Sequence, residues 1–216
     1  MKSTVLLLCA LLLAVFSMNA QIKKGAVLLG GQIGLSATKI DLQQTNPSSS
    51  NSKSTSFSIS PSFGKAIKEN LIVGADLSYG YQKNEYNGAK TTSNNYGLGV
   101  FVRQYKQLVK DLYFFTQLRA GGNYSKGGYN TSDPFSNYDT NGYGVQLAIY
   151  PGLSYGVSKK LQIEAGFNNL AYLQFSHGKQ TYTGGSGNVY KSNGLSLGSS
   201  LSDYGGLTVG FRVLLN

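Results

Sequence analysis

Apolar and small polar residues alternate along residues 56–81. The apolar positions at the start of this stretch are Phe57, Ile59, Pro61 and Phe63, and serine or glycine stands between them. After a short turn at residues 68–70, the alternation continues to Tyr81. A period of two is typical of a β-strand with unlike faces. The stretch therefore predicts a β-hairpin with a tight turn.

The same hairpin pattern recurs twice further along the chain, at shifts of 41 and 90 positions. The matched residues keep their spacing on both sides of the turn: Asn70 with Asp111 and Leu71 with Leu112 at the shorter shift, and Pro61 with Pro151 and Leu71 with Leu161 at the longer. Equal spacing around three turns indicates an internal repeat, which bears on the whole architecture.

Eight strands are predicted in all, followed alternately by short turns and long polar loops. The strands cover residues 25–37, the two arms of 56–81, 95–105, 112–124, 143–156, 161–173 with a bulge at Asn168-Asn169, and 206–215. Short turns are expected near residues 67–70, 107–111 and 157–160, and loops over 38–53, 83–93, 125–141 and 174–204. An even number of strands of about ten residues with this alternation of loops is typical of an outer-membrane barrel.

Backbone groups must all be paired inside hydrocarbon, so such a sheet has to close on itself. The predicted fold is all-β, an eight-stranded antiparallel up-and-down transmembrane β-barrel. Composition agrees, because charged residues make up 13% of the chain against about 25% in soluble domains. The less apolar strand face is mostly Gly, Ser and Gln, which suits a narrow interior better than a surface in water.

Residues 1–20 resemble a secretory signal peptide, with Lys2 before an apolar run and Ala20 at the expected cleavage point. The barrel is assigned to residues 21–216. Cys9, the one cysteine, lies in the predicted signal peptide, so no disulfide framework is expected. The net charge of +10 is spread over turns and loops and forms no stripe. Contact with anionic headgroups of outer-membrane lipid and lipopolysaccharide, or simple solubility, explains this charge, and we expect no nucleic acid.

Tyrosines cluster toward the long-loop ends of the predicted strands. They are Tyr79, Tyr81, Tyr96, Tyr124, Tyr143 and Tyr172. Tyrosine belts of this kind meet the headgroups in membrane barrels. Core packing in a soluble β-sandwich is the alternative interpretation.

Few ionisable residues fall on the predicted inner face. They are Asp76, Arg103, Arg119, Glu164 and Arg212. Because single buried charges are costly, we expect them to pair. Glu164 and Arg212 lie at similar depth from the short turns, and Asp76 is within reach of Arg103 or Arg119. The set predicts either a network that plugs the lumen or a gate on an ion path.

Catalytic chemistry finds little support. The one histidine, His177, falls in a predicted loop and lacks the His-x-Ser arrangement of outer-membrane acyltransferases and deacylases. Metal binding lacks a second histidine, a mature cysteine and a carboxylate cluster. We expect no enzyme, no cofactor and no metal.

Five further segments have a characteristic sequence: Ala20-Gln21, Gly25–Gly34, Ile59–Gly64, Lys110–Phe115 and Ile149–Ser154. Together they resemble the outer-membrane β-barrel domain family common in Bacteroidota, which includes PorT-like "porin family" proteins. The resemblance implies a small barrel similar to the OmpA transmembrane domain. It also implies export to the outer membrane of a Gram-negative bacterium and folding by the barrel-assembly machinery.

The function that this sequence favours is a monomeric outer-membrane barrel with a structural or surface-interaction role and a lumen filled by side chains. A narrow porin-like channel for ions or small solutes is the first alternative. A soluble lipocalin-like binding barrel is the second. The long loops predict no particular ligand.

Overall fold

The computed structural model describes residues 22–42, 50–158, 160–167, 170–184, 187–199 and 207–215. The predicted signal peptide lies outside these ranges. None of the helical segments within them has the length and apolar character needed to cross a membrane.

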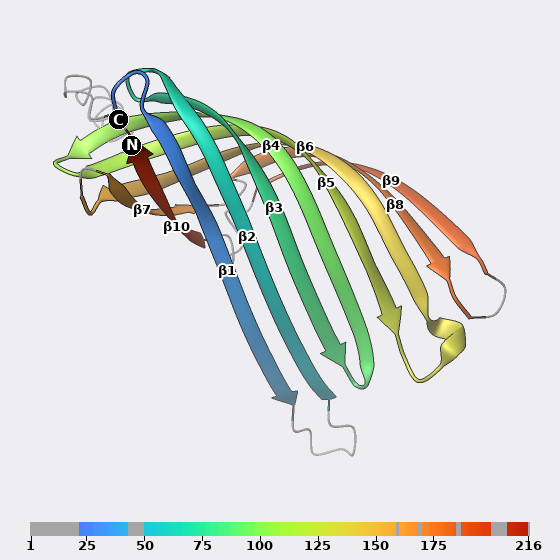
Figure 1. Ribbon diagram of the computed structural model, residues 1–216. Helices are drawn as coiled ribbons and strands as arrows, with labels where there is room; N and C mark the ends of the chain where they lie inside the picture. Colours follow the sequence, from blue (N-terminus) through green and yellow to red (C-terminus); the bar gives the residue numbers. More distant parts are fainter. Residues whose placement is uncertain are drawn as a thin grey trace, which may run out of the picture.

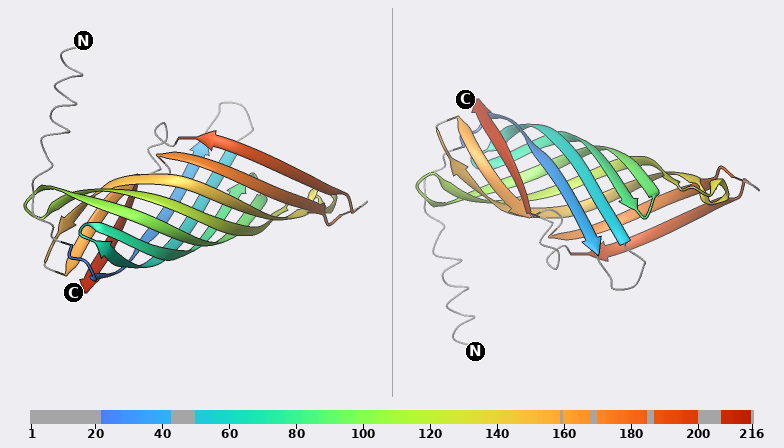
Figure 2. Two further views of the ribbon diagram at one scale, coloured as in Figure 1. Left: turned by 90° about the horizontal axis from the view of Figure 1, so that it is seen from above. Right: turned by 90° about the horizontal axis from the view of Figure 1, so that it is seen from below.

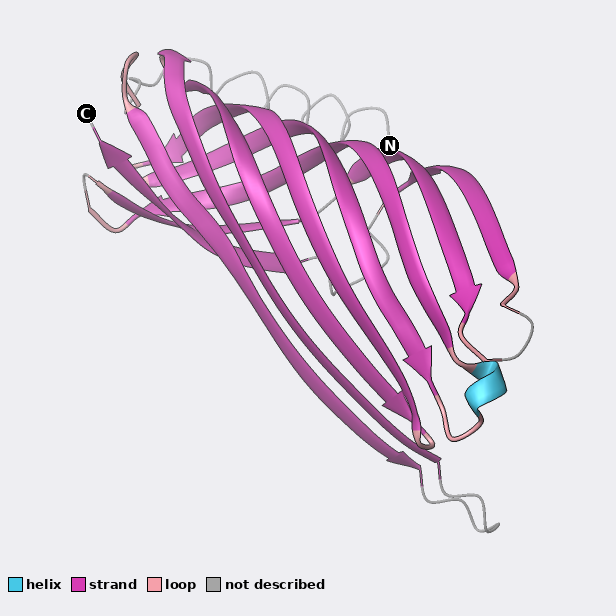
Figure 3. Ribbon diagram, turned by 45° about the vertical axis from the view of Figure 1, so that its right-hand side comes forward, coloured by secondary structure: helices cyan, strands magenta, loops and turns pink. Residues whose placement is uncertain are grey.

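Nearly all described residues belong to β-strands (Figures 1 and 3). The strands are β1 (Val27–Leu42), β2 (Ser50–Lys68), β3 (Leu71–Tyr86), β4 (Ala89–Val109), β5 (Leu112–Asn130), β6 (Tyr138–Gly156), β7 (Leu161–Phe167), β8 (Ala171–Tyr182), β9 (Val189–Gly198) and β10 (Leu207–Leu215). A short 3₁₀ helix, η1 (Pro134–Ser136), connects β5 to β6.

Eight of these strands close into a ring, as the sequence predicts. All neighbours in the ring are antiparallel, and its order is β1, β2, β3, β4, β5, β6, β7, β10 and back to β1. The closing ladder pairs β1 with β10 from Val27 opposite Leu215 to Gln32 opposite Gly210. Figure 2 shows the strands wrapping around the barrel axis.

The two remaining strands lie where a loop is predicted. β8 continues beyond β7 along β6, and β9 pairs with β8. The loop predicted over residues 174–204 is therefore wrong for most of its length. The partner of β6 changes from β7 to β8 between Gly152 and Ile149. The predicted bulge at Asn168-Asn169 lies outside the described residues.

Both prolines of the repeat lie where a ladder is interrupted. The β2–β3 register omits Pro61 and resumes at Ser62 opposite Asp76. Pro151 stands at the change of partner along β6. Because proline has no backbone N–H to donate, these gaps are the positions in a closed sheet that tolerate it.

The strands are longer than predicted at the long-loop end. β1 has 16 residues and β4 has 21, about one and a half and two times the roughly 9 to 11 that cross a bilayer. The predicted loop over residues 83–93 is in fact a two-residue hairpin at Asn87-Gly88, with φ of 47° and 83°, the backbone of a type I′ turn. The loops predicted over 38–53 and 125–141 are likewise shortened by β1, β2, β5 and β6.

The short turns lie where the repeat predicts them. Asn70 and Asp111 both adopt positive φ, 58° and 62°, and a bulge precedes each turn, between Ala66 and Lys68 and between Gln107 and Val109. Two hairpins therefore share one turn geometry, which accounts for the match at a shift of 41 residues.

The two faces of the barrel wall differ as predicted. Large apolar side chains point outward and are exposed, among them Ile33, Ile59, Leu77, Leu98, Leu118, Val145, Leu173 and Phe211. Inside, at the short-turn end, Ile22, Leu28, Ile72, Tyr105 and Tyr113 form a buried cluster. Asn70 N–H donates to Ile22 O over 3.0 Å, which holds the segment before β1 against this cluster. The base of the lumen is therefore packed with side chains.

The upper half of the wall is a curved sheet rather than a ring. Among the described residues, β1 beyond Gln32 pairs with β2 alone, and β9 pairs with β8 alone. The described lumen is closed all round at the base only.

Leu77 and Ser78 lie on opposite faces of the barrel wall, so substitutions at these adjacent positions should change the free energy of unfolding by different amounts. Leu77 is 57% exposed on the apolar outer face, whereas Ser78 lines the lumen. Leu77→Arg should lower the free energy of unfolding from lipid vesicles by about 2 to 4 kcal/mol, and Ser78→Ala by less than about 0.5 kcal/mol. Equal effects in urea titrations of the two variants would contradict the assignment of the faces.

Candidate functional site in the lumen

A buried charge cluster lies directly above the apolar base. Glu164 of β7 accepts two hydrogen bonds from Arg103 Nη1 of β4, at 2.7 and 2.8 Å, and one from the Tyr105 hydroxyl at 2.9 Å. Arg212 of β10 places Nε 3.2 Å from Glu164 Oε2. The side chains of all three charged residues are at most 4% exposed. One carboxylate thus joins three strands that are distant in sequence.

Neighbouring groups hold Arg103 in this position. Its Nε donates to Gln117 Oε1 over 2.8 Å, and Gln117 is also its cross-strand partner on β5. The ring of Phe115 lies 4.4 Å from the guanidinium carbon, a cation–π contact. Gln117 is not among the site residues predicted from the sequence. The sequence pattern could have identified Gln117, because inward-facing residues of neighbouring strands lie opposite one another and Gln117 lies opposite Arg103.

A second ion pair lies further up the lumen. Arg119 of β5 binds Asp76 of β3 through Nε at 2.8 and 2.9 Å and through Nη2 at 2.6 Å. These side chains are 16% and 11% exposed. Of the two partners expected for Asp76, Arg119 makes the contact, and Arg103 joins Glu164. All five inner charges selected from the sequence therefore lie in these two groups.

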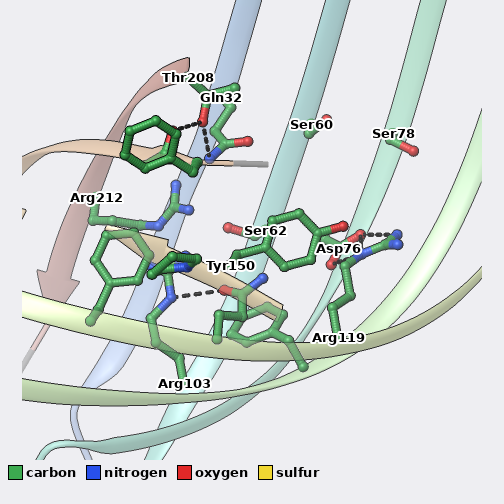
Figure 4. Close-up of a pocket in the computed structure, with 16 residues that line it drawn as sticks. Gln32, Ser60, Ser62, Asp76, Ser78, Arg103, Arg119, Tyr150, Thr208 and Arg212 are labelled. Atoms are coloured by element: carbon green, nitrogen blue, oxygen red, sulfur yellow. Dashed lines mark hydrogen bonds and ion pairs between the residues drawn. The ribbon is translucent and has the colours of Figure 1, made fainter. Parts of the chain in front are cut away.

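A cavity of about 210 Å³ separates the two groups of charges (Figure 4). Arg103, Arg212 and Ser62 line one part of it, and Asp76 and Arg119 another. Above it, a second cavity of about 240 Å³ is lined by uncharged polar side chains such as Asn95, Asn123, Gln146 and Gln174, together with Arg119. Above the charged base the lining of the lumen is thus polar, and Arg119, which also lines this second cavity, is paired with Asp76.

Four of the predicted belt tyrosines form one row across the outer wall. Tyr79 pairs with Tyr96, Tyr96 with Tyr124, and Tyr124 with Tyr143. Tyr81 follows two residues after Tyr79 on the same face of β3. Tyr172 lies elsewhere, because it pairs with Ala148, whose side chain is buried on the inner face. Its assignment to the belt is corrected accordingly. Ile163 of β7 and Leu173 of β8 both point outward, so Tyr172, which precedes Leu173, faces the lumen.

His177 extends the tyrosine row. It lies in β8 and not in a loop, stacks on Tyr143 with ring centroids 5.0 Å apart, and places Nδ1 2.7 Å from Asn193 Oδ1. Neither neighbour is a nucleophile or a carboxylate. Within the described ranges, no group of three or more His, Cys, Asp or Glu side chains is arranged to hold a metal ion.

Comparison with solved structures assigns the class of fold. The outer membrane protein OprG from Pseudomonas aeruginosa superposes with a TM-score of 0.51 at 12% identity, covering 92% of this chain and all of that one. Neisserial surface protein A gives 0.39 at 15% identity (88% and 99% covered), and a major outer membrane protein from Thermus thermophilus gives 0.42 at 11% (88% and 99%). The likeness to OprG supports an outer-membrane type of β-barrel fold.

Searches by sequence add no narrower group. No protein-family model matches the chain, and no curated protein matches it significantly. Membership of the Bacteroidota family stays a prediction from the quoted segments.

Removal of the central carboxylate should be the most costly change in the lumen. Glu164→Gln leaves two buried guanidinium groups without a counter-charge, so the free energy of unfolding should fall by about 3 to 5 kcal/mol. Asp76→Asn is the matched control, because its partner Arg119 is partly exposed, and it should cost less than half as much. Urea unfolding in lipid vesicles measures both variants, and a larger loss in Asp76→Asn would contradict the role given to Glu164.

Proposed function

We propose that the protein is an outer-membrane β-barrel with a sealed base, acting in a structural or surface-interaction role in the envelope of a Gram-negative bacterium. The observation that carries this proposal is the filled lumen at the short-turn end. There, the apolar cluster around Tyr105 and Tyr113 and the ion pairs of Glu164 occupy the barrel interior. We propose no catalytic activity.

The outer face supports placement in a membrane. A band of exposed apolar side chains encircles the barrel, and it includes Leu77 at 57% and Leu98 at 61% exposure. A face of this size and composition would not stay dispersed in water. The row of tyrosines beyond the band fits the headgroup level. We place the short turns on the periplasmic side and the long strands outside, as is usual for such barrels.

The same distribution of side chains opposes a soluble lipocalin-like binder. Such a barrel would carry its apolar residues inside, around a ligand, and polar residues outside. Here the upper lumen is lined by amides and hydroxyls, including Asn95, Asn123 and Gln146. Among the described residues, the large buried apolar side chains inside the barrel form one packed cluster at the base.

A tyrosine ladder near the far strand ends supports the surface-interaction role. Tyr129 stacks on Tyr138 at 5.0 Å, Tyr138 lies 5.4 Å from Tyr182, and Tyr182 lies 5.8 Å from Tyr190. The four residues come from four successive strands, β5, β6, β8 and β9. Tyrosine surfaces combine apolar area with a hydrogen-bonding group and are common in recognition. The ladder is the part of the upper wall that we propose for contact with an external partner.

Electrical recording tests the sealed base. The refolded protein in a planar bilayer should show no discrete conductance steps, because side chains block the lumen at the Glu164 level. A double variant, Glu164→Ala with Arg212→Ala, removes the charged pair but leaves the apolar cluster of Tyr105 and Tyr113 in place, so it should stay silent as well. Discrete steps in the native protein that change in the double variant would refute the sealed base and favour the narrow channel.

A further inference from the structure

The base of the lumen carries one positive charge more than its carboxylates balance. Arg103, Arg119 and Arg212 face it, against Asp76 and Glu164, among the described residues that line or floor the lower cavity. A buried charge without a counter-charge is costly. The excess of one positive charge belongs to the cluster as a whole. The hydrogen bonds and ion pairs show which arginine lacks a carboxylate of its own.

Arg212 is the arginine that is least compensated. Asp76 binds Arg119, and both oxygens of Glu164 already accept hydrogen bonds from Arg103. Arg212 Nη1 donates only to backbone oxygens, Phe211 O at 2.9 Å and Gly31 O at 3.2 Å. Its Nε lies close to Glu164 but makes no directed hydrogen bond, although it is buried. Arg212 itself is 3% exposed.

A second unsatisfied group shares this cavity. The hydroxyl of Ser62 is buried and has no hydrogen-bond partner. Figure 4 shows Ser62 and the guanidinium of Arg212 beside the same space, with Gln32 and Thr208 above them. Buried polar groups without partners are rare in folded proteins, and each one indicates a missing partner. The Ser62 hydroxyl can donate as well as accept, and Arg212 carries a full positive charge, so a negatively charged acceptor suits the space between them.

We propose that this cavity binds one small monovalent anion, a carboxylate such as formate or acetate or a halide, between Arg212 and Ser62. The volume of about 210 Å³ exceeds the roughly 30 Å³ share of one water, so it admits a small carboxylate. The guanidinium fork matches two carboxylate oxygens. A single negative charge balances the excess of one, whereas a cation would increase it. The site is independent of whether the barrel conducts.

Thermal unfolding in the presence of chosen anions tests the site. The refolded protein in an uncharged detergent is heated in sodium formate or in sodium gluconate at equal ionic strength. Formate fits the cavity and should raise the unfolding temperature with saturation, because it binds the folded state only. Gluconate carries the same charge on a much larger body and should give a much smaller saturable rise. Equal shifts with both salts would overturn the proposal.

Direct binding is measured on the same samples from the linewidth of ¹³C-formate. The native protein should broaden the line, and Arg212→Gln should weaken binding at least tenfold. Lys126→Gln removes the same charge from an exposed position on β5 and should leave binding unchanged. Undiminished broadening in Arg212→Gln, or no broadening in the native protein, would contradict the site.

A pair of substitutions at Ser62 keeps the test valid if Arg212→Gln does not fold. Ser62→Asp places a carboxylate in the cavity and should abolish the formate response. Ser62→Asn has the same shape without the charge and should retain the response at an affinity reduced a few-fold. A formate response that survives in Ser62→Asp, or that is lost equally in both variants, would refute the charge-based site.

Discussion

Closure of the sheet is the constraint on which the rest of the structure depends. A strand in hydrocarbon has no water to satisfy its N–H and C=O groups, so every edge must find a partner. Here the ladder between β1 and β10 closes the ring, from Val27 opposite Leu215 to Gln32 opposite Gly210. Beyond Gln32, β1 pairs with β2 alone, and β9 pairs with β8 alone, so among the described residues these two strands form the free edges of the sheet.

A ring of eight strands leaves a lumen that side chains fill, and this sets the chemistry of the base. Charged groups in such a space must neutralise one another. Glu164 therefore lies between Arg103 and Arg212, and Asp76 binds Arg119. In this enclosed lumen little water reaches Arg212, so its surplus positive charge is costly.

The sequence predicts the strands in which apolar and polar residues alternate, and the prediction is wrong for segments that lack this alternation. In the alternating strands, the period of two identifies both faces, and the repeat predicts the turns at Asn70 and Asp111. Residues 174–198 read as loop because Ser, Gly, Asn and Gln dominate them, although Leu195 and Leu197 of β9 are 75% and 83% exposed on the outer face. The pattern misplaces Tyr172, because the next residue, Leu173, points outward and Tyr172 therefore faces the lumen. The charged residues of the lumen can be selected from the pattern. Which arginine meets Asp76 depends on barrel curvature, which the pattern does not contain.

The most direct test of the closed barrel is a disulfide across the closing ladder. Leu29 and Val213 are cross-strand partners on β1 and β10, and the chain without its predicted signal peptide has no other cysteine. In refolded protein, Leu29→Cys with Val213→Cys should oxidise to an internal cross-link that shifts gel mobility and reverses with reductant. The control, Leu35→Cys with Val213→Cys, should stay reduced. No cross-link in the first pair, or equal cross-linking in both, would contradict closure of the barrel through β1 and β10.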